Sequence, residues 1–128
     1  MNWVKMAVSS SELPESIRGD IRRYQDVTEK LRLILLNKQQ VQLQLSEVRN
    51  ALKELEKLSE GSVYKLIGNV MVSKKKDEIV SELNERQETL EVRLKSLEKQ
   101  ESLLRKQLEE LEKKLSRKLG GPQTGSAG

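Results

Sequence analysis

The stretch VYKLIGNVMV, residues 63–72, is rich in β-branched and apolar side chains and carries a single charge. Val, Ile and Tyr at this density favour β-strands, and Gly68 supplies the positive φ angle that a tight turn requires. The flanking segments have helical periodicity and almost no Gly or Pro. The stretch therefore predicts one small β-hairpin between two long helices.

Two placements of the hairpin turn fit the stretch. A turn centred on Ile67-Gly68 sets Val63 opposite Val72, so that apolar residues face apolar residues across the strands. A turn centred on Gly68-Asn69 sets Lys65 opposite Val72, which is a poorer match between cross-strand neighbours. We therefore predict the first placement.

A two-stranded hairpin is marginal in water because it cannot bury both faces or pair both edges. It either folds back on its own helices as an apolar loop or is completed by hairpins of other chains, which is the alternative we favour. The residues predicted to serve assembly are the apolar ones and the turn glycine: Val63, Tyr64, Leu66, Gly68, Val70, Met71 and Val72.

The composition indicates a coiled coil rather than a compact globule. Aromatic residues make up 2% of the 128 residues, too few for an aromatic-rich core, while charged residues of both signs make up 34%. Because the signs alternate, the net charge of +4 is weak support for nucleic-acid binding. The absence of Cys fits a reducing compartment, and no apolar run approaches the roughly twenty residues of a membrane span. We expect a soluble, cytoplasmic protein.

The segment 15–60 is predicted to form the first helix, after an N-terminal arm over 1–14 that shows no signal-peptide pattern. Its apolar residues alternate in steps of three and four, which is typical of a coiled-coil seam. The seam residues are Ile17, Tyr24, Val27, Leu31, Ile34, Val41, Leu45, Val48, Leu52 and Leu55. Asp20 and Lys38 interrupt the series, and Gly61 is expected to close the helix in the left-handed conformation.

The second helix is predicted over 74–119, after a hairpin spanning 62–73 and before a polar tail over 120–128. Its seam is formed by Val80, Leu83, Leu90, Leu94, Leu97, Leu104, Leu108, Leu111 and Leu115. Lysines 74–76 do not suit the positive end of a helix dipole, and they indicate either an acidic neighbour or, as we prefer, a solvated charge run. An antiparallel pairing with Leu52 opposite Leu83 brings the a positions of each helix to the d positions of the other.

At the helix ends away from the hairpin, the same pairing sets apolar residues against charged ones. Ile17 falls opposite Lys118 and Asp20 opposite Leu115. Apolar side chains there are expected to be only partly buried, which indicates either ordinary fraying or contact with another protein. The predicted contact residues are Leu13, Ile17, Ile21, Leu111, Leu115 and Leu119, with Trp3, Val4, Met6 and Val8 of the arm nearby.

Residues that carry common enzyme chemistry are missing from the sequence. It has no His and no Cys, no glycine-rich phosphate loop and no Ser in a nucleophile-elbow context. Its carboxylates alternate with lysines at helical spacing, which is typical of solvated ion pairs. We therefore predict no catalytic, cofactor-binding or metal-binding residues.

The hairpin and its surroundings resemble the beta-type subunits of the prefoldin family. The resemblance rests on V-Y-K-x-x-G-N-V-x-V at 63–72, on L-E-V-R-L at 90–94 and on K-Q-E at 99–101, and it extends over about 17–119. The single hairpin is similar to the beta type, since the alpha type carries two.

The resemblance implies a hexamer of two alpha-type and four beta-type subunits whose hairpins form a β-barrel. It also implies an ATP-independent holdase that needs no cofactor, binds unfolded polypeptides at the coiled-coil tips and delivers them to a group II chaperonin. The basic end of the second helix offers candidates for chaperonin contact: Lys113, Lys114, Arg117 and Lys118. The alternatives are a structural coiled-coil spacer or tether without client binding, and a basic nucleic-acid-binding rod.

Overall fold

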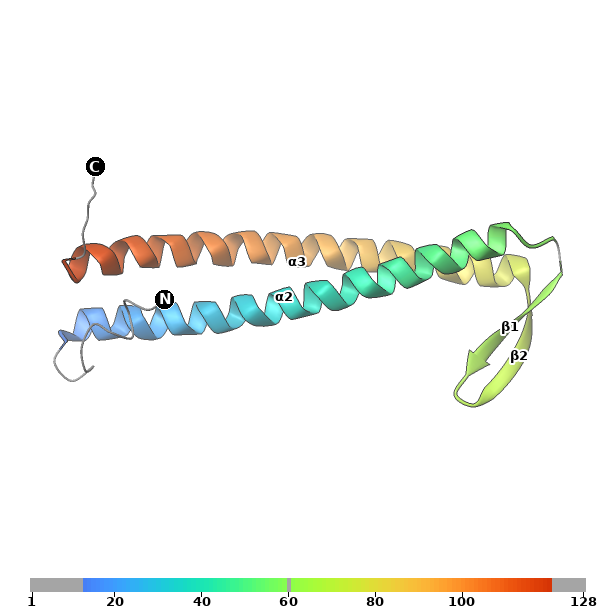
Figure 1. Cartoon of the computed structure of the whole chain (residues 1–128), viewed down its shortest axis with the longest axis horizontal. Helices are drawn as coiled ribbons and strands as arrows, with labels where there is room; N and C mark the ends of the chain where they lie inside the picture. The colour runs from blue at the N-terminus through green and yellow to red at the C-terminus, as the bar shows by residue number, and fades with distance from the viewer. Residues whose placement is uncertain (1–12, 60, 121–128) are drawn as a thin grey trace. The chain divides into compact units, whose positions relative to one another are not determined.

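The computed structural model describes residues 13–59 and 61–120. In chain order it contains helix α2 (Glu15–Glu56), strand β1 (Ser62–Ile67), strand β2 (Val70–Lys75) and helix α3 (Lys76–Lys118) (Figure 1). The predicted fold class is confirmed, because the chain is mainly α-helical with one antiparallel hairpin between two long helices. The predicted arm and tail, including Trp3, Val4, Met6 and Val8, lie almost entirely outside the described residues.

The chain forms two compact units. The hairpin unit spans 36–98 and contains the end of α2, both strands and the start of α3. The end unit contains the start of α2, up to Leu35, and the end of α3, from Lys99. Each unit thus pairs one segment of α2 with one segment of α3.

The predicted seam forms the core of both units. In the hairpin unit the buried side chains are Val41, Leu45, Val48, Leu55, Leu90 and Leu97. In the end unit they are Ile17, Tyr24, Val27, Leu31, Leu111 and Leu115, together with Asp20. Burying one such aliphatic side chain contributes about 2 kcal/mol, so two narrow helices become stable through a single row of contacts.

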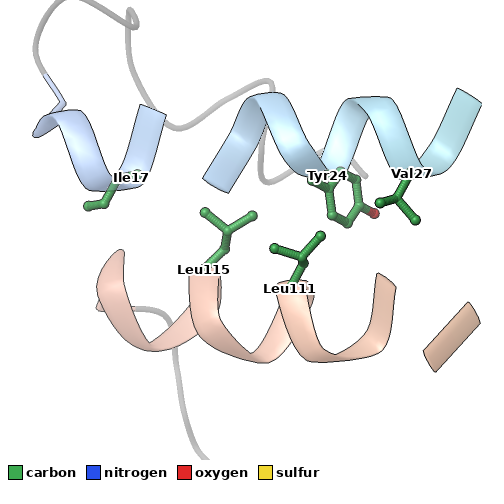
Figure 2. Close-up of a cluster of buried hydrophobic side chains, with 5 residues drawn as sticks. All are labelled: Ile17, Tyr24, Val27, Leu111 and Leu115. Atoms are coloured by element: carbon green, nitrogen blue, oxygen red, sulfur yellow. The ribbon is translucent and has the colours of Figure 1, made fainter. Parts of the chain in front are cut away.

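Figure 2 shows how the seam of the end unit interdigitates. Leu115 projects from α3 toward α2 between Ile17 and Tyr24, and Leu111 lies opposite Tyr24. This order agrees with the antiparallel pairing that the heptad pattern predicts, because the two leucines of α3 meet the side of α2 that carries Ile17, Tyr24 and Val27.

The predicted hairpin register is wrong. Ile67 pairs with Val70 and Lys65 with Val72, so the turn is Gly68-Asn69. Gly68 has a φ of 61°, and Asn69 does not adopt a positive φ. Hairpin turns that match the strand twist need a positive φ at their first central position. Glycine meets this requirement and the β-branched Ile67 would not, so turn geometry outweighs cross-strand matching.

The connections around the hairpin also differ from the prediction. Helix α2 ends at Glu56 with a tightened turn, in which the Leu58 amide donates to the Leu55 carbonyl at 3.1 Å. Gly61 therefore does not close α2; with a φ of 155° it leads into β1. Strand β2 continues to Lys75, because the Lys76 amide still donates to the Gly61 carbonyl at 3.1 Å.

Two of the three lysines at 74–76 are strand residues rather than the start of a helix. The third, Lys76, donates from Nζ to the Leu58 carbonyl oxygen at 2.7 Å, just beyond the end of α2. A cation is favourable there because unpaired carbonyl groups accumulate at the carboxyl end of a helix. This contact ties the first turn of α3 to the end of α2, in place of the expected solvated charge run.

Candidate functional site

The hairpin carries exposed apolar side chains on both faces. Because neighbours in a strand alternate between faces, Tyr64, Leu66 and Met71 share one face, and they are 67%, 67% and 66% exposed. The other face carries Ile67 and Val70 near the turn, both more than half exposed. Its remaining apolar residues, Val63 and Val72, are half-buried. Among the described residues, each face of the hairpin therefore keeps apolar side chains that are more than half exposed.

Both strands are also edge strands, since the sheet has two strands. In a hairpin with a two-residue turn, Ile67 and Val70 exchange hydrogen bonds, and every second residue directs its backbone groups outward. The outward residues are Tyr64 and Leu66 on β1 and Met71 and Ser73 on β2. The outward amide of Lys75 is already taken by Glu78 Oε1 at 3.4 Å. The edges available for pairing therefore lie beside the exposed apolar side chains.

An ion pair holds the hairpin to α3. Lys65 Nζ lies 3.0 Å from both carboxylate oxygens of Glu82. Tyr64, Lys65 and Glu82 contribute to an open groove of about 670 Å³ between β1 and the first turns of α3. Because the pair is half exposed, it contributes little to the stability of the fold. It does determine which face of the hairpin is directed toward α3.

Ile67 belongs to this exposed surface, although the sequence prediction left it out. The prediction placed Ile67 inside the turn, whereas it is a strand residue, paired with Val70 and 52% exposed. Hairpin turns prefer glycine at their first central position. This preference places Gly68 in the turn and Ile67 in the strand, and it is the sequence signal that identifies Ile67. The other assembly candidates lie in the strands, or in the turn in the case of Gly68.

The helix ends are closed, contrary to the prediction. Ile17, Leu111 and Leu115 were expected to be partly buried, but they are 7%, 6% and 0% exposed and form the core of the end unit. The other three predicted contact residues, Leu13, Ile21 and Leu119, are partly buried and pack against this core.

Asp20 explains why the end closes. Its carboxylate is buried and accepts a hydrogen bond from Lys118 Nζ at 2.8 Å, with Lys114 Nζ at 3.6 Å and Arg23 Nη1 at 3.8 Å. The hydrogen bond from Lys118 and the surrounding cations lower the pKa of the Asp20 carboxyl, against the opposing effect of burial. The charges that the sequence prediction treated as mismatches thus neutralise one another beside the apolar seam.

Tyr24 adds a second polar tie between the helices of the end unit. Its hydroxyl donates to Glu112 Oε2 at 3.1 Å. Burial and this hydrogen bond to a carboxylate raise the pKa of Tyr24 to about 12. The phenol therefore stays protonated and donates its hydrogen bond across the two helices, while its ring remains part of the apolar seam.

The four basic residues proposed for chaperonin contact divide into two pairs. Lys114 and Lys118 form ion pairs with Asp20. Lys113 and Arg117 are exposed. Lys114 and Lys118 thus have a structural role beside Asp20, and Lys113 and Arg117 are the exposed candidates for contact with another protein.

Comparisons with known proteins agree with this geometry. A family model described as "Prefoldin subunit" matches residues 19–122. The prefoldin subunit beta of Caldivirga maquilingensis is 42% identical over 117 residues, which cover 91% of this chain and 97% of the relative. That of Pyrobaculum islandicum is 39% identical, with 92% and 98% covered. The crystal structure of the prefoldin beta subunit from Thermococcus strain KS-1 matches with a TM-score of 0.78 and 38% identity, covering 87% of this chain and 98% of that one.

In the part of the chain that the structure describes, neither helix has a stretch long and apolar enough to cross a membrane. The family model, the relatives and the matching fold all cover the same two helices and the hairpin between them. The chain belongs to the prefoldin family of chaperone subunits, on its beta-type branch.

Proposed function

We propose that this chain is one of four beta-type subunits which, with two alpha-type subunits, form a hexameric holdase in the cytoplasm. The complex binds unfolded polypeptides without ATP and delivers them to a group II chaperonin. The single observation that carries this proposal is the contrast between a sealed helical seam and a hairpin whose two faces and two edges are open.

The hairpin is the proposed assembly site. Exposed edge groups add strands from another chain, and exposed apolar side chains on both faces need a second layer to cover them. A closed barrel of hairpins supplies both, since it leaves no edges. We propose the following assembly residues: Val63, Tyr64, Leu66, Ile67, Gly68, Val70, Met71 and Val72.

The end unit is the proposed client-binding region. Of the predicted residues there, Leu13, Ile21 and Leu119 retain partial exposure. Ile17, Leu111 and Leu115 are buried and would meet a client only if the helix ends separated. Several end units held together by the hairpins would bind one unfolded chain through many weak contacts.

A structural spacer without client binding is the second candidate, and the sealed core of the end unit favours it. A mass measurement in solution, on the chain alone and mixed with an alpha-type subunit, tests assembly. An aggregation assay on a chemically denatured client, without ATP, tests holding. We expect a particle of two alpha-type and four beta-type chains that suppresses aggregation. A monomer or dimer that does not suppress aggregation indicates the spacer, and a hexamer with no effect on aggregation removes the holdase role.

The exposed basic pair is the proposed contact for the chaperonin. Charge reversal at Lys113 and Arg117 should weaken binding of the hexamer to a group II chaperonin with little effect on helix content, because both side chains are exposed. Reversal at Lys114 and Lys118 is the matched comparison, and it should destabilise the end unit through Asp20. Unchanged chaperonin binding in the first variant would count against this contact.

A further inference from the structure

The end unit has an apolar groove on its flank, outside the buried seam. Leu33 of α2 and Leu103 of α3 are 47% and 61% exposed, and they line a groove of about 380 Å³ together with Ile34 and Leu104. Both exposed leucines occupy the heptad position two residues after a, which in an antiparallel pair lies on the same flank. Because the seam is already filled, these leucines contribute little to the core.

The groove is also unusual in its charge. Charged residues make up 34% of the chain, yet among the described residues Lys30 is the only charged one that lines this groove. A second groove of the same unit, which shares Lys30 and Gln107 with the first, is lined by charges of both signs. Water hydrates the charged lining of the second groove well. In the Leu33–Leu103 groove, contact between water and the apolar lining is unfavourable.

The rim determines what fits the groove. Gln107 offers an amide donor and acceptor, and Lys30 offers an ammonium donor. Apolar side chains together with unpaired backbone amides are presented by an unfolded polypeptide, since a folded surface has paired its backbone. The positive charge of Lys30 favours acidic over basic residues beside the apolar stretch.

We propose that the Leu33–Leu103 groove binds a short apolar stretch of an unfolded polypeptide, with a preference for stretches flanked by acidic residues. The inference rests on the proposed holdase function and gives it a location. The client then binds the flank of a closed end unit, and the core of Ile17, Leu111 and Leu115 stays shut.

The test uses the full hexamer and the double variant Leu33→Gln/Leu103→Gln. Glutamine is a good helix former, so the variant should fold. The probe is a fluorescent peptide with a central Leu-rich stretch and Glu flanks, and its binding is followed by anisotropy. We expect its affinity to fall about tenfold, from the loss of two leucine contacts, with the hexamer mass unchanged. Leu43→Gln/Val92→Gln, which changes two other exposed apolar residues, is the matched control and should bind normally.

Lys30→Glu tests the charge preference independently. It should reverse the order of affinity between a peptide with Glu flanks and the same peptide with Lys flanks. Wild-type affinity in the Leu33→Gln/Leu103→Gln hexamer would overturn the groove proposal while leaving the holdase function intact. A wild-type hexamer that binds no peptide and does not suppress aggregation would overturn both. A change of mass caused by the double variant would assign the groove to a second copy of the chain instead.

Discussion

The hairpin unit and the end unit differ in how far they expose similar apolar side chains. The hairpin leaves Tyr64, Leu66 and Met71 about two-thirds exposed, whereas the end unit buries Leu111 and Leu115 almost completely. The difference in exposure follows from the element that faces the apolar side chains in each region. The end unit has a facing helix and a charge network at Asp20, while the hairpin has its own second strand, one ion pair to α3 and an open groove beside it. The core of the end unit is formed within a single chain, and we propose that the hairpin is completed by further chains.

The largest expected effect is on assembly. Val70→Asp places a carboxylate on an exposed hairpin face that we propose becomes buried in the hexamer. Burying an unpaired charge costs several kcal/mol, so association with the alpha-type subunit should weaken about a hundredfold or more. Light scattering should show smaller particles, and circular dichroism should show unchanged helix content.

Val92→Asp is the control for this substitution, since Val92 is 69% exposed on α3 of the same unit. It should assemble normally. Intact hexamers from the Val70→Asp chain would end the assembly role of the hairpin.

The second effect is on the stability of the end unit. Leu115→Ala removes a side chain with 0% exposure from the core and should lower the free energy of unfolding by about 2–5 kcal/mol. Leu103→Ala, at 61% exposure, should lower it by less than about 1 kcal/mol. Urea unfolding of both variants measures the difference. Equal losses would mean that the end is not closed as described.

The third effect concerns Asp20 and acid. The lowered pKa means that the carboxylate stabilises the folded state above its unfolded pKa, and that this contribution disappears as the pH falls through the lower folded pKa. Asp20→Asn should cost about 1–2 kcal/mol at neutral pH. The variant should lose less stability than the wild type when the pH is lowered below about 4. Thermal unfolding between neutral pH and pH 2 gives this comparison, and parallel curves would exclude the role of Asp20.

The smallest effect is expected at Tyr24. Its raised pKa means that the neutral phenol stabilises the fold below the unfolded pKa, near 10, and that this contribution is lost as the pH rises through about 12. Tyr24→Phe should cost about 1 kcal/mol through loss of the hydrogen bond to Glu112. The variant should also show a weaker loss of stability in alkali. An identical alkaline profile would assign the base sensitivity to other groups.

The sequence was sufficient for the helices, the seam and the place of the hairpin, because regular apolar spacing is a strong and local signal. The hairpin register failed because cross-strand matching was given more weight than the φ angle that Gly68 must adopt. On a sheet whose two faces are exposed, contacts between cross-strand side chains contribute little to the choice of register. The turn glycine decides such cases.

The closed helix end was not predictable from the heptad pattern alone. The pattern sets Asp20 opposite Leu115 and Lys118 opposite Ile17. It does not show that the two charged side chains pair with each other, at 2.8 Å, from distant segments of the chain. The Leu33–Leu103 groove was missed for another reason. The heptad pattern describes only the seam positions, whereas both leucines lie on the flank of the helix pair.

The most direct test of the contrast between the two units is amide hydrogen exchange, measured on the chain alone and in complex with an alpha-type subunit. We expect the outward amides of Tyr64, Leu66, Met71 and Ser73 to exchange rapidly in the lone chain and to become protected in the complex. Amides of the end unit should keep the same rates in both states. Equal rates at the four strand amides would contradict the account, as would protection that appears only in the end unit.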